Sequence, residues 1–260
     1  MKTFVKILKD FPWFLWSGWG SISSVCLFFA LWDFGNKYYG DMVLPSPLLT
    51  FVTLKELFLD GGFKEDLYLT VFRALKGFGV SLVIGSILGL LAGFFKTASI
   101  FSRPIVTILV GVPPIAWIVM AMIWFGFGNG TIAFTVIIAS FPIVFAGAMQ
   151  GSRTIEGKYK EVCDVFKLKW HQKITNLYIP HLISYFFPSY ISALGIAWKV
   201  VVMAELLGAS DGIGVRLGIA RSYLDTPTAL ALVCSMVIVL LFIEYVILEP
   251  VKKEVEQWRS

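Results

Sequence analysis

Two ionisable side chains, Lys199 and Glu205, lie within the otherwise apolar stretch 182–207 and are the first candidates for chemistry in this chain. A charged group costs free energy inside a lipid-buried helix, so it is often retained there for a function. The two residues are six positions apart, so they point to different faces of a helix and are poor candidates for a pair. We expect Lys199 to contact an anionic solute and Glu205 to act as a gate or a packing anchor. Snorkelling of both side chains toward the nearby membrane surface is the alternative.

Pro113 and Pro114 form a second candidate, because they lie well inside another apolar stretch, 104–125. Two consecutive prolines remove two backbone donors, so the helix must kink or break, and the freed carbonyl groups need protein or water around them. Trp117 follows about one turn further along. We interpret this kink as part of a solute pathway, to which we also assign Trp198. A kink that is simply buried against neighbouring helices is the alternative.

Motifs for catalysis or cofactor binding are missing from the sequence. It contains no G-x-x-x-x-G-K-[ST] phosphate loop, and the glycine-rich stretch 208–218 follows an apolar span rather than a strand. No Ser-His-Asp or Cys-His arrangement occurs at one depth. His171 and His181 have no metal-ligand pattern between them, and the three cysteines do not form a disulfide framework. We therefore expect no enzymatic activity, no metal and no cofactor in this chain.

The composition is that of an integral membrane protein. Of 260 residues, 57% are apolar and only 15% are charged, whereas a soluble domain carries about 25% charged residues. The net charge of +5 arises from basic residues between apolar stretches rather than along one face. It is therefore a signal of membrane topology and does not indicate nucleic-acid binding.

Apolar stretches of about 20 residues are long enough to cross the hydrocarbon core as helices. Arg73 and Lys76 lie near the start of the second stretch and are expected to snorkel outward. Gly85, Gly89 and Gly93 share one helix face, where a neighbouring helix of this chain or of a second copy can approach closely. We predict an all-α membrane protein with six spans, at about 13–32, 69–95, 104–125, 131–150, 182–207 and 228–248.

The distribution of Lys and Arg predicts the orientation of the chain. With a cytoplasmic N-terminus, fourteen basic residues fall in inner segments and five in outer ones. Both termini are then cytoplasmic. We predict a short amphipathic helix or a basic tail at residues 1–12. Residues 13–250 are expected to form one transmembrane domain, and residues 251–260 a cytoplasmic tail.

Residues 153–181, the polar segment, form the longest polar interruption between apolar spans, with six basic and three acidic side chains. Within it, Tyr159, Val162, Phe166 and Trp170 recur at helical spacing. An apolar stripe on a charged helix needs a partner or the membrane surface to cover it. Because a mostly lipid-embedded chain has few soluble surfaces, we expect this segment to contact a soluble protein.

The polar segment resembles the EAA loop of permease subunits of binding-protein-dependent ABC importers. Glu161 is followed after sixteen residues by Leu177, Ile179 and Pro180 at the family's intervals, and the chain departs from the pattern at Val162, Cys163 and Lys167, where the family has two alanines and a glycine. Together with LPSP, VPPIAW, WFGFG and AELLGA-x-x-GIG, this resembles the nitrate, sulfonate and taurine branch over about residues 44–258.

The resemblance implies a type I importer permease: a homodimer with two cytoplasmic ATPase subunits, which bind ATP and magnesium, and an extracytoplasmic solute-binding protein. The binding protein would dock on the outer loops 33–68 and 208–227. The cytoplasmic coupling helix would contact the ATPase through Glu161, Asp164, Val165, Phe166, Lys167, Leu168, Trp170 and Pro180. The translocation path would include Pro113, Pro114, Trp117, Trp198, Lys199 and Glu205.

Three other readings stay open at this point. Permeases for pyrimidines or thiamine precursors have similar sequences, so the small solute, which Lys199 suggests is an anion, could be of that kind. An ATP-independent secondary transporter or channel would use the polar segment as a regulatory loop. A membrane enzyme is disfavoured by the missing catalytic motifs.

Overall fold

The computed structural model describes residues 22–155, 163 and 165–248, and these residues contain helices but no strand. This confirms the predicted all-α class for the described part of the chain. A helix over 22–39 comes first. The helices that follow are α2 (Pro47–Leu59), α3 (Gly61–Phe94), α4 (Lys96–Gly111), α5 (Pro114–Phe125), α6 (Asn129–Arg153), α8 (Trp170–Lys173), the π-helix η1 (Ile174–Tyr178), α9 (Ile179–Gly208), α10 (Ile213–Ser222), α11 (Thr226–Phe242) and the π-helix η2 (Ile243–Leu248).

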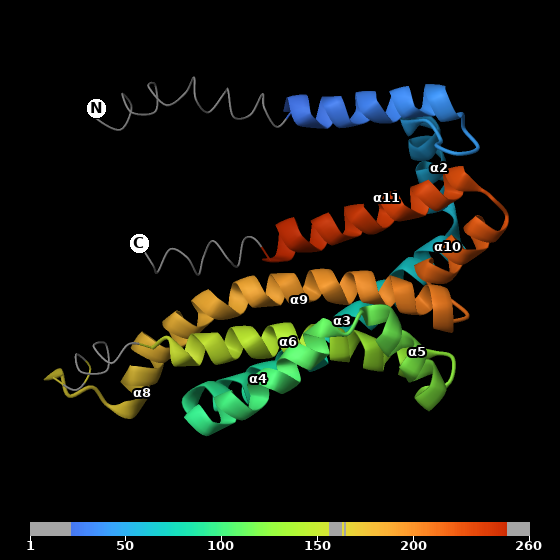
Figure 1. The fold of residues 1–260 in the computed structure, drawn as a ribbon. Coiled ribbons are helices and arrows are strands. Elements are labelled where there is room, and N and C mark those ends of the chain that lie inside the picture. The colour runs from blue at the N-terminus through green and yellow to red at the C-terminus, as the bar shows by residue number, and fades with distance from the viewer. Residues whose placement is uncertain (1–21, 156–162, 164, 249–260) are drawn as a thin grey trace, which may run out of the picture.

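The centre of the bundle is formed by α3, α6 and α9, which run along one another (Figure 1). Their close packing depends on the glycine face of α3. A Cβ atom added at Gly89 would clash with the carbonyl oxygen of Phe145 on α6, and one added at Gly85 or Gly93 would clash with other atoms of that helix. The predicted close approach is confirmed, and the neighbour is a helix of the same chain.

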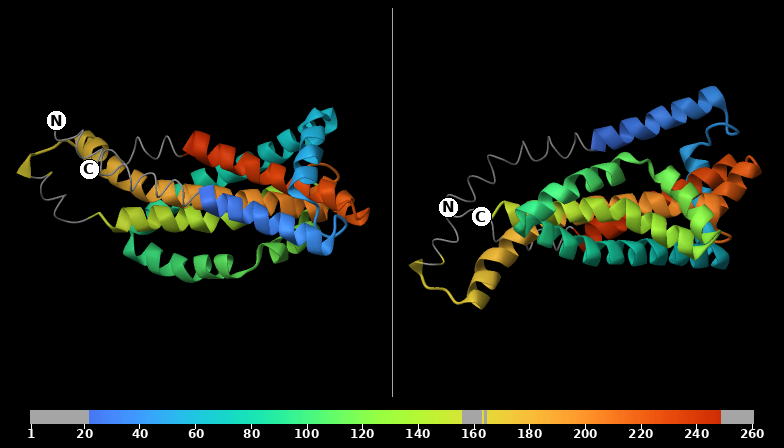
Figure 2. Two further views of the ribbon diagram at one scale, coloured as in Figure 1. Left: turned by 90° about the horizontal axis from the view of Figure 1, so that it is seen from above. Right: turned by 60° about the horizontal axis from the view of Figure 1, so that its bottom comes forward.

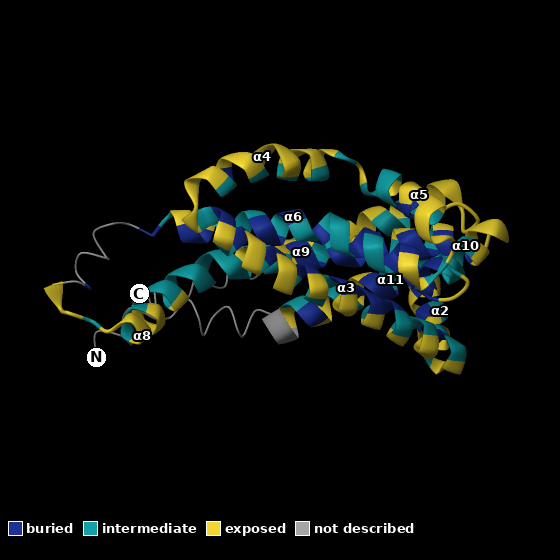
Figure 3. Ribbon diagram, turned by 90° about the horizontal axis from the view of Figure 1, so that it is seen from below, coloured by how far each residue is buried: buried dark blue, intermediate teal, exposed yellow. Residues whose placement is uncertain are grey.

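The helix breaks at the two prolines, as predicted. The axes of α4 and α5 differ by 92° across Val112 and Pro113, and α5 begins at Pro114. Helix α4 lies outside α6 and is exposed along nearly its whole length, with Ser99 as its one buried residue, whereas α6 is buried at many positions (Figure 3).

Four helices are long and apolar enough to cross a membrane, and the bent α4–α5 pair brings the number to five in the described residues. The first predicted span, 13–32, lies partly outside these residues. Two helices begin well before the predicted spans: α3 at Gly61 rather than Leu69, and α4 at Lys96 rather than Pro104. For α3 the reason is a cap, since the Asp60 carboxylate accepts hydrogen bonds from the amides of Gly62 and Phe63.

The bundle has two distinct ends. Helix α8 lies at one end, and α2 and α10 lie at the other, in each of the views (Figures 1 and 2). Helix α2 follows the LPSP stretch and begins directly after its N-cap Ser46. At the same end the Thr226 hydroxyl lies 3.1 Å from the carbonyl oxygens of Asp41 and Met42, and so ties α11 to the segment before α2.

Candidate functional site

Glu205 is the centre of a buried polar cluster that joins α3, α9 and the turn between α9 and α10. Its side chain has no exposed surface, and that of Arg73 is 9% exposed. Arg73 Nη1 donates to Glu205 Oε1 at 3.0 Å, and the Thr70 hydroxyl lies 2.8 Å from Oε2. The amide of Gly214 donates to Oε2 at 3.1 Å, and Arg73 Nη2 donates to Asp211 Oδ1 at 2.6 Å. We call Thr70, Arg73, Glu205, Asp211 and Gly214 the Glu205 cluster.

Two glycines let the backbone close around this carboxylate. Gly212 has a φ of 105°, in the left-handed region, and an added Cβ would lie 2.5 Å from the Glu205 carboxylate. At Gly214 an added Cβ would lie 2.4 Å from the carbonyl oxygen of Val202. The GIG part of AELLGASDGIG is therefore required by the tight turn around Glu205, which fixes α10 against α9.

A second set of ion pairs holds α10 to the start of α3. Arg216 Nε donates to Asp66, and Arg216 Nη1 donates to Asp60 Oδ2 at 2.9 Å. The hydrogen bond from Arg216 lowers the pKa of Asp60 below its usual value of 3.8. Burial lowers the pKa of Arg216, but its hydrogen bonds to Asp66 and Asp60 outweigh burial and raise that pKa. Asp66 also accepts a hydrogen bond of 3.0 Å from the Gly212 amide.

The structure corrects one interpretation of the sequence and confirms another. Arg73 does not snorkel outward: it is buried because Glu205, Asp211 and Asn129 satisfy its guanidinium. Lys199 and Glu205 do not pair, as their spacing predicted. Lys199 is exposed, and neighbouring Trp198 is buried in the core of the bundle.

Most partners of Glu205 were not identified from the sequence, although the sequence contains a polar stripe that indicates them. Asp66, Thr70 and Arg73 are spaced by four and three residues, so they form a polar stripe on one face of α3. That stripe faces α9 and α10, and its members bond to residues more than 130 positions away in the chain.

The break between α4 and α5 leaves an unusual buried donor. Trp117 Nε1 is buried without a hydrogen-bond partner among the described residues. The indole packs against Phe134 of α6, with ring centroids 6.4 Å apart. Pro113 is exposed and Pro114 is partly buried. The role of these three residues in a solute path stays a prediction.

The polar segment is described only in part, and Glu161 and Asp164 lie outside the described residues. Val165, Phe166 and Trp170 are 79%, 74% and 74% exposed. Leu168 and Pro180 are partly buried.

The chain turns at Lys167, which has a φ of 49°, so the predicted helix does not continue unbroken to Trp170. Lys167 therefore has a left-handed backbone at the position where the resemblance to the EAA pattern expects glycine, the residue that adopts this conformation most readily.

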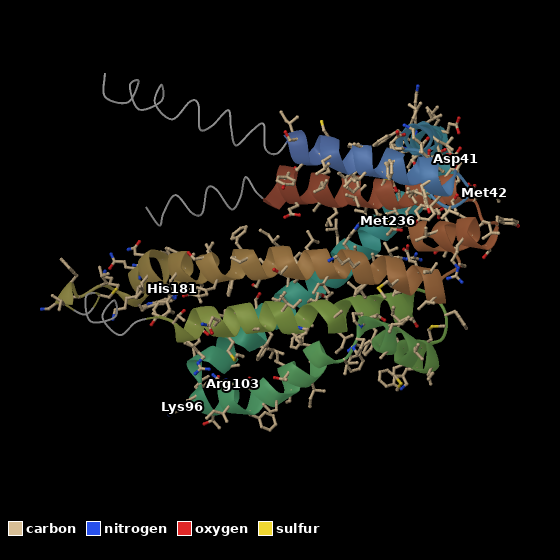
Figure 4. The ribbon with its side chains drawn as sticks, turned by 45° about the horizontal axis from the view of Figure 1, so that its top comes forward. Asp41, Met42, Lys96, Arg103, His181 and Met236 are labelled. Atoms are coloured by element: carbon tan, nitrogen blue, oxygen red, sulfur yellow. The ribbon has the colours of Figure 1, made fainter. Side chains whose placement is uncertain are left out.

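Charged and polar groups mark the end of the bundle that carries the polar segment. Lys96, Arg103 and His181 lie toward that end, whereas Asp41 and Met42 lie at the opposite end, near α10 (Figure 4). Arg153 Nη1 donates to the Ser99 hydroxyl at 2.8 Å, and the Thr154 hydroxyl lies 3.1 Å from His181 Nε2. In the described residues no group of three or more His, Cys, Asp or Glu side chains could hold a metal ion.

Comparison with known families identifies the architecture. The family described as "Binding-protein-dependent transport system inner membrane component" matches residues 81–250. The chain belongs to this family. The resemblance seen in the sequence is thereby confirmed, and the protein is an inner-membrane permease component of an ABC importer rather than an enzyme.

Several relatives are similar in sequence to this permease over most of its length. SsuC of Bacillus subtilis, named as an aliphatic sulfonates transport permease protein, is 32% identical over 78% of this chain and 74% of its own. The nitrate import permease protein NrtB of Synechococcus elongatus is 30% identical over 73% of this chain and 72% of its own. The bicarbonate transport system permease protein CmpB of the same organism is 24% identical, over 78% and 76% respectively.

A solved structure shares the fold of the permease. A chain of the MetNI methionine ABC transporter, in inward facing conformations, matches with a TM-score of 0.54 and 16% identity, covering 71% of this chain and 94% of that one. At this identity the match supports the type I permease fold alone.

Proposed function

We propose that this permease forms the translocation path for a small anionic solute, such as a sulfonate, taurine or nitrate, which an extracytoplasmic binding protein delivers. The main support is the set of relatives named for aliphatic sulfonates, nitrate and bicarbonate, all of which are anions. Lys199 agrees with that cargo, because it is an exposed cation in a spanning helix.

The permease receives its energy from two separate ATPase subunits through the polar segment. Val165, Phe166 and Trp170 are exposed apolar side chains at the end of the bundle where the segment lies. Such side chains in a polar loop are suited to a groove on a soluble partner. Glu161, Asp164, Lys167, Leu168 and Pro180 complete the coupling surface in this proposal.

Movement of the ATPase pair would act on α6 and α9, which flank the polar segment. Helix α9 continues without interruption from the segment to the Glu205 cluster, because Trp170–Gly208 is one helical stretch. The cluster then joins α9 rigidly to α3 and α10. A tilt imposed at the polar segment would therefore reach the opposite end of the bundle, where the binding protein docks on segments 33–68 and 208–227.

The functional unit is a dimer of permeases with six spans each and both termini in the cytoplasm. The exposed apolar surface of α4 and α5 supports a second copy as a neighbour within the membrane, because few residues of these helices are covered by their own chain. The break at Pro113 and Pro114, with Trp117 beside it, would line the path between the two copies.

Uptake by reconstituted complexes tests this proposal. Proteoliposomes that contain the permease, its ATPase and its binding protein are supplied with labelled taurine, nitrate or a thiamine precursor. We expect ATP-dependent uptake of an anion and a several-fold loss in Lys199→Gln. Preferred uptake of the thiamine precursor would contradict the anionic cargo.

A substitution in the polar segment tests its proposed coupling role. We expect Glu161→Lys to insert normally into the membrane but to lose co-purification with the ATPase. Normal ATPase stoichiometry with this variant would contradict the assignment of the polar segment.

A further inference from the structure

A groove of about 190 Å³ between α3 and α6 has no role in the transport scheme above. Its polar lining residues are Arg73, Lys76 and Asn129. The groove opens beside the Glu205 cluster, yet no carboxylate of the described residues lines it. It therefore combines basic and amide donors, while the nearest acids, Glu205 and Asp211, lie on the far side of Arg73.

Lys76 is the cation of the groove that has no ion-pair partner among the described residues. Arg73 is paired on its other side with two carboxylates, those of Glu205 and Asp211, so it adds no net positive charge to the groove. Lys76 is exposed and has no hydrogen bond or ion pair with any residue that the structure describes. Asn129 Oδ1 accepts a hydrogen bond of 2.8 Å from Arg73 Nε, so the amide NH2 of Asn129 remains available as a donor. These groups suit an oxyanion.

The depth of Lys76 places this charge near a membrane surface. Asn129 is the first residue of α6, so the contact between Arg73 and Asn129 marks the level at which α6 begins, and α3 extends beyond that level to Gly61. Lys76 lies three residues further along α3, about 4.5 Å deeper. Helical side chains lean toward the N-terminus of their helix, which here directs the ammonium group back toward that end.

The rest of the groove is apolar and continues into an exposed apolar surface that would face the lipid. Leu69, Phe72 and Ile137 line it. Beyond it, Val83 and Ile87 extend the exposed apolar face of α3, at 55% and 54% exposure. A ligand that fills the site would thus carry an oxyanion at one end and a hydrocarbon chain at the other.

We propose that this groove binds the phosphate group of an anionic phospholipid, with Lys76 as its counter-ion, Asn129 as a hydrogen-bond donor and an acyl chain along α3. The lipid compensates a cation that is otherwise costly in a spanning helix. A transported alkanesulfonate also combines an anionic group with a hydrocarbon chain, so the experiment must distinguish a bound lipid from a bound solute.

Native mass spectrometry of the purified full-length permease tests the proposal, with phosphatidylglycerol and phosphatidylcholine as probes. The wild type is expected to retain phosphatidylglycerol in preference to phosphatidylcholine. Lys76→Gln, which keeps a polar side chain but removes the charge, should weaken that preference about fivefold. Lys76→Arg should retain it. Lys64→Gln is the matched control, because Lys64 is also an exposed lysine of α3 but does not line the groove.

Three results would overturn the assignment. Unchanged lipid preference in Lys76→Gln would show that the groove does not select the anion. An equal loss in Lys64→Gln would show that only net charge matters. Displacement of phosphatidylglycerol by propanesulfonate in the wild type, but not in Lys76→Gln, would assign the groove to the transported solute instead of lipid.

Discussion

Replacement of Glu205 by alanine tests whether the buried Glu205 cluster stabilises the fold. The carboxylate is fully buried and accepts hydrogen bonds from Thr70, Arg73 and Gly214. Its removal leaves Arg73, which is 9% exposed, without its innermost partner. Breaking a buried ion pair in this way costs about 3–5 kcal/mol. We expect the lower end, about 3 kcal/mol, because Arg73 keeps its contact with Asp211.

Thermal unfolding in detergent, followed by tryptophan fluorescence, measures this loss. For a chain of this size about 3 kcal/mol lowers Tm by roughly 6–12 °C. Asp33→Ala is the control, because Asp33 and Lys37 form an exposed ion pair at 2.7 Å. Such a pair contributes about 0.3–0.5 kcal/mol, so the control should shift Tm by roughly 1–2 °C.

A double-mutant cycle shows whether the loss comes from the Glu205–Arg73 pair. Arg73→Met in the Glu205→Ala background removes the stranded cation, so the double variant should be more stable than the two single effects predict. We expect a coupling free energy of about 1–3 kcal/mol. Additive effects, or a Glu205→Ala variant as stable as Asp33→Ala, would refute the reasoning.

Three further predictions follow from local geometry. Lys167→Gly should preserve ATPase binding, whereas Lys167→Val should weaken it, since glycine adopts the left-handed conformation freely and a β-branched side chain tolerates it least; equal binding by both variants in a pull-down would contradict this. Gly214→Ala should lower Tm because its Cβ would lie 2.4 Å from a carbonyl oxygen, whereas Gly79→Ala, with open space around it, should not; equal Tm values would count against the tight turn. The pKa of Asp60 is lowered in the fold, so its contribution to stability is present above pH 3.8 and is lost as pH falls through its folded pKa. The Tm gap between wild type and Asp60→Asn should therefore shrink below pH 3.8, and a gap that widens there would contradict the ion pair.

Local patterns in the sequence predicted much of the fold. The four-residue spacing of Gly85, Gly89 and Gly93 can be read directly as a face for close helix packing, and the structure confirms it. Pro113 and Pro114 predict a break because their effect on the backbone is local. Helix starts were less predictable, since the cap at Asp60 extends α3 into polar sequence that hydropathy does not count.

The Glu205 cluster was beyond local reasoning. Arg73 lies 132 positions before Glu205, and periodicity on α3 does not identify which distant helix it faces. Snorkelling was therefore the interpretation for Arg73, and it was wrong. Glu161 and Asp164, which we propose as coupling residues, lie outside the described residues, so their role rests on the EAA resemblance.

The central claim is that this membrane permease does no transport without ATP hydrolysed by a partner bound at its polar segment. Solute uptake by proteoliposomes, with and without the ATPase and ATP, tests it most directly. We predict uptake only when permease, ATPase, ATP and loaded binding protein are all present. Uptake at a comparable rate by the permease alone would contradict the account.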